Sequence, residues 1–284
     1  MIRNFFIFSF LYCGALGAQD RPPWMGEELK ISPYAKYTFQ SFQEIESSCR
    51  DQPYSERAHF LNLGLGSSVF QWSANLELVG AKTRHQDCNI DQLNLIITKH
   101  IFNDILGDPF ALSMGAKIIQ AFKNSLYDVS SFHHGQFEVE CYVSMGKECA
   151  KSFYWLNRYW ILGAIGQADR GYPWLRGNFI LEKQWWPRHR LTLLGELLLG
   201  TGNKTINLCE FKGYGPIAHR SIDLGIQYHY LVDSDVEFTM GYEYRVYAQN
   251  FPKHAQFFSI KLQNYISPFD FLPARWLISN FGKK

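Results

Sequence analysis

The sequence lacks several features that would each indicate a particular class of protein. Beyond its first residues it contains no apolar run of the roughly 20 residues that a membrane-spanning helix requires. The formal net charge is only +2, and no concentrated basic stripe is present, which argues against nucleic acid as a partner. No CxxC pair and no Cys/His spacing typical of zinc occurs. We therefore expect no helical inner-membrane protein, no nucleic-acid binder, and no metal or other cofactor.

Residues 1–18 have the composition of a secretory signal peptide. Arg3 precedes an apolar run from Phe5 to Leu16, and small residues around Ala18 predict cleavage after that position. The run is too short to span a bilayer as a helix, so it predicts export rather than anchoring. Residues 19–33 contain Arg21-Pro22-Pro23 and are predicted to be a periplasmic lead-in, with a small plug as the alternative, because proline cannot join a central strand.

Short segments of alternating apolar and polar residues follow. The strongest runs from Asp235 to Tyr247, where apolar residues share one face and charged or small residues share the other. Successive side chains of a strand point to opposite faces, so this pattern predicts a strand with one apolar and one wet surface. The preceding segment repeats the pattern, and Val232-Asp233-Ser234-Asp235 predicts a tight hairpin turn between the two.

Twelve such segments predict the fold. They are residues 34–46, 57–66, 68–80, 91–101, 109–121, 133–146, 154–167, 173–185, 188–201, 218–231, 234–247 and 255–266. Most have the roughly 9–11 residues of a tilted membrane strand, and an even number suits a single-chain barrel with both ends in the periplasm. The predicted fold is all-β: a closed, antiparallel, up-and-down transmembrane β-barrel over residues 34–268. Residues 269–284 are predicted to be a C-terminal tail or a final strand.

The connections between these segments predict two different ends. The connections near Gly66-Ser67-Ser68 and Asp233-Ser234 are short, whereas those near Asn124 and Lys212 are longer and are expected to be polar external loops. Five cysteines remain after the predicted cleavage, an odd number. Cys49 and Cys88 fall in the first two external loops and are predicted to form a disulfide; Cys209 is an alternative partner, and chance placement is the competing interpretation.

The whole mature chain resembles the bacterial outer-membrane β-barrel proteins in a general way, without a motif specific to one family. The resemblance implies a bacterial outer-membrane location, surrounding membrane lipid, and the barrel assembly machinery as a partner. Aromatic residues near strand ends, such as Trp72, Trp160 and Trp174, are expected to form interfacial girdles. The chain departs from the usual pattern at its C-terminus, where Phe281 is followed by Gly282-Lys283-Lys284. A water-soluble barrel or sandwich, with its apolar face turned inward, is the competing interpretation.

If the apolar faces meet lipid, the polar faces line a lumen. The predicted pore-lining residues are Lys36, Glu77, Lys117, Glu140, Arg176, Glu196, Asp223, Glu237, Glu243, Arg245 and Lys261. Acids on consecutive strands and lysines at the closure of the barrel predict opposed charged walls; the alternative is that these residues pair and fill a narrow interior. Twelve strands lie between the number that side chains fill and the number that leaves a wide channel. The sequence therefore predicts a narrow, porin-like channel for passive diffusion of small polar solutes.

An outer-membrane lipid hydrolase and a structural or adhesion barrel are the alternative functions. Trp155-Leu156-Asn157-Arg158-Tyr159 is similar to the Trp-Asn-Arg segment of the outer-membrane phospholipases, but Leu156 interrupts the tripeptide. His133 and His134 lack the serine that the phospholipase pattern places two positions on, and a hydroxyl nucleophile needs a base within hydrogen-bond reach. No catalytic residue is therefore predicted, and a channel is preferred over an enzyme.

Overall fold

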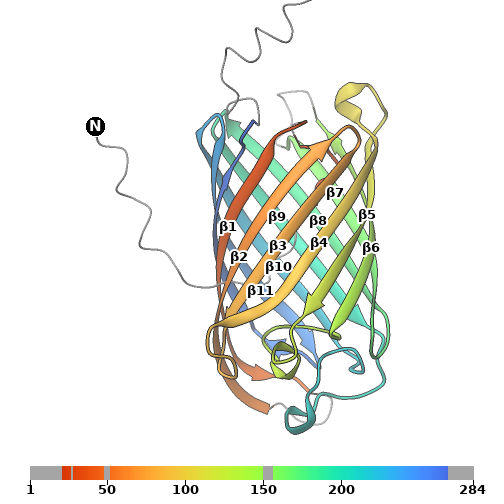
Figure 1. The fold of residues 1–284 in the computed structure, drawn as a ribbon, viewed down its shortest axis with the longest axis vertical. Helices are drawn as coiled ribbons and strands as arrows, with labels where there is room; N and C mark the ends of the chain where they lie inside the picture. The colour runs from red at the N-terminus through yellow and green to blue at the C-terminus, as the bar shows by residue number, and fades with distance from the viewer. Residues whose placement is uncertain (1–20, 27, 48–51, 150–155, 268–284) are drawn as a thin grey trace, which may run out of the picture.

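The computed structural model describes residues 21–26, 28–47, 52–149 and 156–267, which form one barrel (Figure 1). Within these ranges there are twelve long strands and one strand of two residues. They are β1 (Ile31–Ile45), β2 (Gln52–Val69), β3 (Trp72–Lys82), β4 (Asn89–Phe102), β5 (Ala111–Ala121), β6 (Phe137–Glu148), β7 (Arg158–Ala168), β8 (Trp174–Trp186), β9 (His189–Gly200), β10 (Arg220–Asp233), β11 (Val236–Gln249), β12 (Pro252–Lys253) and β13 (Gln256–Asn264). Three short 3-10 helices accompany them: η1 (Asp104–Leu106), η2 (Ser125–Tyr127) and η3 (Leu208–Glu210).

The sheet closes on itself. Every long strand is antiparallel to its neighbours, and β1 pairs with β13 on one side and with β2 on the other. Closure leaves no long unpaired edge, which matters because lipid offers no hydrogen-bond partner to a free backbone N–H or C=O. The predicted closed antiparallel barrel of twelve strands is confirmed.

The apolar face of each strand points outward. On β11, Met240 and Tyr242 are exposed, whereas Glu243 and Arg245, on the opposite face, are only 4% exposed. This orientation is the reverse of a water-soluble barrel, whose apolar residues fill the interior. The apolar outer wall supports the predicted location in a bacterial outer membrane. None of the helices in the described part of the chain is long and apolar enough to cross a bilayer.

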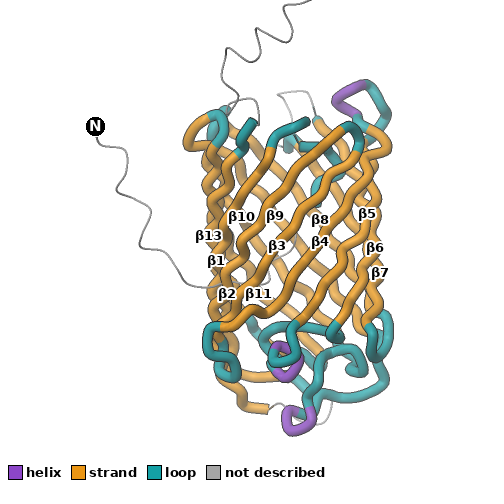
Figure 2. The backbone as a smooth tube through the Cα atoms, viewed as in Figure 1, coloured by secondary structure: helices purple, strands orange, loops and turns teal. Residues whose placement is uncertain are grey.

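The two ends of the barrel differ, as Figure 2 shows. One end, here the turn end, carries the connections at residues 70–71, 103–110, 187–188 and 234–235 together with the end of β6, the starts of β7 and β1, and the end of β13. The other, here the loop end, carries residues 46–47, 83–88, 122–136, 169–173, 201–219 and 250–255. Short connections and both strand termini are typical of the periplasmic side, so the turn end is assigned to the periplasm.

The turn between β2 and β3 is displaced from its predicted position. Gly66-Ser67-Ser68 has turn-forming composition, yet β2 continues to Val69, and Phe70, with a φ of +56°, makes the turn with Gln71. Gly66 is needed for close packing instead: a Cβ there would lie 2.6 Å from the Ser32 Oγ on β1. The residue type reflects a close cross-strand approach, which composition alone does not distinguish from a turn.

The two longest loops fold inward and close the loop end, although they were expected to be polar and external. These loops, residues 122–136 and 201–219, are here called the lid. Their apolar residues Val129, Ile206, Phe211 and Tyr214 belong to one buried cluster that also includes residues of β1, β2, β7, β8, β9 and β13. Because β1 and β7 lie on opposite sides of a twelve-stranded barrel, a cluster containing both spans the lumen.

Hydrogen bonds between the two loops hold the lid together. The Tyr214 backbone N–H donates to the carbonyl oxygen of His133 (2.7 Å), and the Tyr214 hydroxyl donates to that of Val129 (3.0 Å). The Gly215 N–H donates to the carbonyl oxygen of His134 (3.0 Å). Polar backbone groups of both loops are thereby satisfied inside an apolar cluster, as buried groups require.

Candidate functional site

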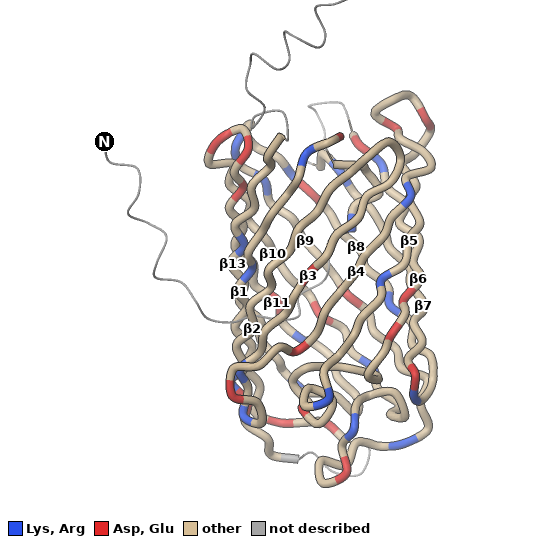
Figure 3. The backbone as a smooth tube through the Cα atoms, in the orientation of Figure 1, with Lys and Arg blue, Asp and Glu red and all other residues tan. Residues whose placement is uncertain are grey.

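All eleven predicted pore-lining residues lie on the inner face of the barrel. Figure 3 marks the positions of the charged residues along the backbone. The structure divides them along the lumen. Lys36, Glu77, Glu237 and Lys261 line a cavity of about 430 Å³ toward the turn end. Arg176, Glu196, Asp223, Glu243 and Arg245 line a smaller cavity of about 50 Å³ beneath the lid. Lys117 and Glu140 are cross-strand neighbours on β5 and β6, and both are buried. That these residues line an open pore stays a prediction.

Acids and bases alternate around the wall in the middle of the lumen. The Arg176 guanidinium lies 3.1 Å from a Glu140 carboxylate oxygen and 2.7 Å from one of Glu196. Arg245 donates two hydrogen bonds to Asp223, at 2.7 and 2.8 Å, in the bidentate geometry that suits a carboxylate. These acids and bases therefore pair across strands that are adjacent or separated by one strand, as in the alternative in which the charged residues pair.

Residues 21–26, here called the N-terminal segment, lie inside the lumen. The Arg21 guanidinium lies 3.0 Å from a Glu140 oxygen and 4.5 Å from the centroid of the Tyr142 ring. The Arg21 carbonyl accepts a hydrogen bond from the Ser144 hydroxyl (3.0 Å), and the Pro23 carbonyl lies 2.9 Å from the His100 Nδ1. These contacts place residues 21–26 inside the barrel, and whether they act as a plug stays a prediction.

Trp24 anchors this segment to an apolar patch of the inner wall. It packs with Ala111, Trp160, Ile180 and Leu194, and its ring meets that of Trp160 edge to face at 5.7 Å. Its Nε1–H donates to the Asp104 carboxylate (2.7 Å), so the one polar atom of the buried ring is satisfied. Trp160 and Trp174 were expected in the outer girdles, but both are almost completely buried on the inside. Trp72, by contrast, is exposed as expected.

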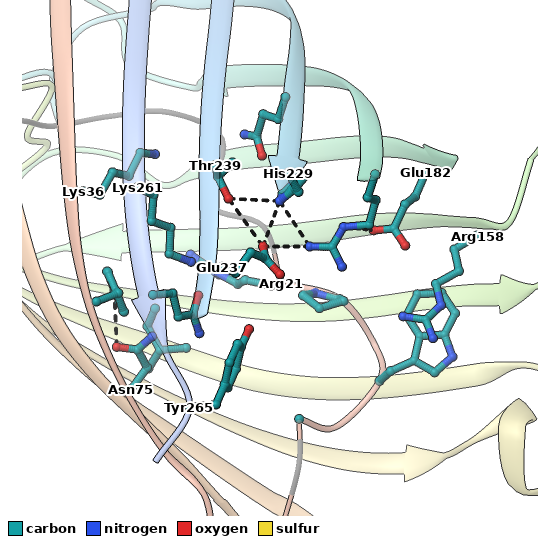
Figure 4. Close-up of a pocket in the computed structure, with 18 of the residues that line it drawn as sticks. Arg21, Lys36, Asn75, Arg158, Glu182, His229, Glu237, Thr239, Lys261 and Tyr265 are labelled. Carbon is teal, nitrogen blue, oxygen red and sulfur yellow. Dashed lines mark hydrogen bonds and ion pairs between the residues drawn. The ribbon is translucent and has the colours of Figure 1, made fainter. Parts of the chain in front are cut away.

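The larger cavity lies beside the N-terminal segment and is lined by residues from most of the strands, among them β1, β3, β7, β8, β10, β11 and β13, as Figure 4 shows for its labelled residues. Its acids are held by neighbours. Glu77 accepts hydrogen bonds from the Tyr34 hydroxyl and the Asn94 amide, both at 2.7 Å. Glu237 lies 2.9 Å from both the Arg190 guanidinium and the His229 Nδ1. Lys36 and Lys261 reach the same space from adjoining strands.

The lid holds two histidines in different charge states. Burial alone would lower the pKa of His133, but the facing carboxylates of Asp91 and Glu138 outweigh burial and raise this pKa to about 10. Burial, followed by the neighbouring His134, lowers the pKa of His219 to about 3. At neutral pH His133 is therefore charged and His219 is uncharged, with the His134 and His219 Nε2 atoms 3.2 Å apart.

The residues considered for lipid hydrolysis are not brought together. Asn157 lies in the connection between β6 and β7 at the turn end, where its side chain accepts a hydrogen bond from the Gln184 N–H. His133 and His134 lie in the lid at the loop end, and the twelve residues of β6 separate the two positions by about 40 Å along the strand. At this distance Asn157 cannot orient either histidine as a catalytic base.

Metal and disulfide sites were also considered. Within the described ranges, no group of three or more His, Cys, Asp or Glu side chains is arranged to hold a metal ion. Cys88 is exposed and forms no disulfide with another cysteine of the described residues. Cys49 lies outside the described residues, so the pairing of these two cysteines stays a prediction. The predicted signal peptide (residues 1–18) and C-terminal tail (residues 269–284) also lie outside them.

No protein-family model matches the chain, and no curated protein matches its sequence. Solved structures nevertheless resemble it. An outer-membrane channel from Pseudomonas putida F1 superposes with a TM-score of 0.66 at 8% identity, covering 89% of this chain and 100% of that one. The NanC porin gives a TM-score of 0.56 at 9% identity, covering 82% and 100%, and the KdgM porin gives 0.50 at 11% identity, covering 81% and 98%. At such identities the likeness establishes the fold: a β-barrel of the outer-membrane type.

Proposed function

We propose that the protein is an outer-membrane channel for passive diffusion of small polar solutes, closed by the N-terminal segment and the lid. The observation that carries the proposal is the polar inner wall with a cavity of about 430 Å³, beside a segment of the chain that is held in the lumen without a covalent bond. A barrel filled only for stability would need neither the cavity nor a removable segment. The same fold in proteins named as a channel and as porins supports this proposal.

Both closures are built from contacts that can be broken. The segment is held by Arg21, Trp24 and a few hydrogen bonds, and the lid by an apolar cluster and backbone hydrogen bonds between two loops. Loops at the barrel end tolerate replacement better than strands, because the strand ladders do not depend on them. Each closure can therefore be removed while the barrel is kept.

Planar-bilayer recordings on three variants test the proposal. In the segment variant, residues 21–26 are replaced by Gly and Ser at the same length. In the lid variant, residues 123–135 and 203–216 are each replaced by a short Gly-Ser linker. The double variant combines both. Folding of each variant is checked in two ways: unheated samples should migrate differently from heated samples on an SDS gel, and the circular dichroism spectrum should show β-sheet.

We expect rare and small current steps from the unmodified protein and stable steps from the double variant, with each single variant in between. Sugars and amino acids of increasing size in liposome-swelling assays then give the size limit of the solutes that pass. A folded double variant that inserts into the bilayer and carries no current would refute the channel.

A further inference from the structure

Two lysines face each other across the seam that closes the barrel. Lys36 on β1 and Lys261 on β13 are direct partners in the antiparallel register, and both line the larger cavity. Like charges directly opposite each other on one face of a sheet are destabilising. A like-charge pair inside a lumen therefore requires a compensating negative charge.

Among the described residues no acid forms an ion pair with Lys36. Of the acids in the cavity, Glu77 accepts hydrogen bonds from Tyr34 and Asn94. Glu237 is held by Arg190 and His229, and its charge also attracts Lys261. The Lys261 ammonium lies 4.8 Å from the centroid of the Tyr34 ring, which keeps it close to the cavity wall.

Most of the charged groups around the cavity are paired. Its charged lining consists of the bases Arg21, Lys36, Arg158, Arg190 and Lys261 and the acids Glu77, Glu182 and Glu237. Arg21 and Arg158 pair with Glu140 and Glu148, which lie outside the lining. Aromatic rings of Tyr34, Trp24, Trp160 and Tyr265 complete the wall. A volume of about 430 Å³ falls within the range of small-molecule sites, which are mostly apolar with a few placed polar groups.

We propose that this cavity binds a small organic acid, with its carboxylate between Lys36 and Lys261 and its carbon skeleton against the aromatic rings. An ammonium group acts as a point charge with three donors, so two of them can share one carboxylate without the planar fit that arginine demands. The inference rests on the proposed channel and assigns it a class of solute, small organic acids. Lys36 and Lys261 would bind the carboxylate of such a solute on its way through the lumen.

Binding and current test this inference separately. D-gluconate and D-sorbitol are matched probes, because they differ in a carboxylate against a hydroxymethyl group. The full-length protein in detergent is titrated with each probe in a calorimeter, at low ionic strength because salt screens such contacts. The dissociation constant for gluconate should be at least about tenfold lower than that for sorbitol. Lys36→Gln and Lys261→Gln together should weaken gluconate binding by tenfold or more. Lys99→Gln, an exposed lysine of β4 on the outer wall, is the matched control and should change nothing.

A second variant guards against a loss of folding. Lys36→Glu places a carboxylate opposite Lys261, so it should stabilise the seam and abolish gluconate binding. Introduced into the variant that lacks both the N-terminal segment and the lid, it should shift the reversal potential toward selectivity for cations. Equal binding of gluconate and sorbitol, or gluconate binding that survives both lysine changes, would overturn the inference. Gluconate binding without current in any variant would refute the channel and leave the carboxylate site standing. Current without any dependence on Lys36 would refute the carboxylate site alone.

Discussion

Trp24→Ala is the sharpest test of how the N-terminal segment is held. The side chain is 7% exposed and packs against four apolar residues of the inner wall, so the substitution leaves a cavity where a ring was. Removing a buried tryptophan costs about 3–5 kcal/mol. Here most of this cost falls on docking of the segment rather than on the barrel, because Trp24 belongs to no strand.

The expected change in docking is large. At about 1.4 kcal/mol for each factor of ten, a loss of about 3 kcal/mol raises the ratio of undocked to docked segment at least about 100-fold. In the lid variant, where the segment is the remaining closure, single-channel recordings should show a matching rise in the open fraction. Trp186→Ala is the control, since Trp186 is 70% exposed near the same end of the barrel. An open fraction that stays within about threefold for Trp24→Ala would show that the segment is not the closure at this end.

Three further predictions concern the wall and the lid. Glu140→Gln should lower the free energy of unfolding in urea by about 3 kcal/mol, because the buried Arg21 loses the carboxylate it pairs with and Arg176 keeps only that of Glu196. Glu148→Gln, in a partly exposed pair, should cost less than about 1 kcal/mol. Gly64→Ala should destabilise the barrel by about 1–3 kcal/mol, since its Cβ would lie 2.1 Å from the Tyr34 ring, while Gly163→Ala meets no atom within 4 Å and should be neutral in the same urea titration. The pKa of His219 lies below that of an exposed histidine, so its contribution to lid stability is complete above about pH 6.5 and falls toward pH 3. Acidifying the segment variant from pH 7 to pH 4 should therefore increase its current, and His219→Gln should flatten that response.

The strands could be predicted from the sequence because alternation is a local property. In residues 236–247 each side chain signals its own face, and the structure places Met240 outside and Glu243 inside accordingly. The outward direction of the apolar face could not be derived from alternation alone, since a soluble barrel has the same pattern. It was inferred from the number and nearly uniform length of the strands and from the many aromatic residues at their ends, and the exposed apolar wall confirms it.

Side chains that depart from the simple pattern were assigned to the wrong surface. Trp160 and Trp174 are aromatic residues near strand ends, which favours a girdle, but their phase along β7 and β8 points them inward. Arg176 and Trp174 are two residues apart on β8 and therefore point to the same face. The inward position predicted for Arg176 thus implied that Trp174 also points inward. The inner wall accepts these rings because Trp24 and the lid cover them, and neither covering element has a periodic signal of its own.

Arg21 and Trp24 were missed as lumen residues for the same reason. The prolines between them exclude a strand but do not say where an irregular segment goes. One signal was present: the eleven predicted lumen residues comprise six acids and five bases, and Arg21 supplies the sixth base. The lid loops likewise contain Phe211 and Tyr214, whose apolar side chains are unusual for an external loop and indicated an inward fold.

The position of the N-terminal segment also constrains the order of assembly. Its partners lie in the middle of the chain, with Ser144 at a separation of 123 positions from Arg21, so it cannot dock until β4 to β7 have paired. The lid needs residues of β1, β7 and β13 together, so it is completed only after the seam between β1 and β13 has closed. Each newly inserted barrel is therefore expected to be open at both ends until the segment and the lid have docked. During that time small solutes can cross the membrane through it, and a cell that makes many copies must tolerate this leakage.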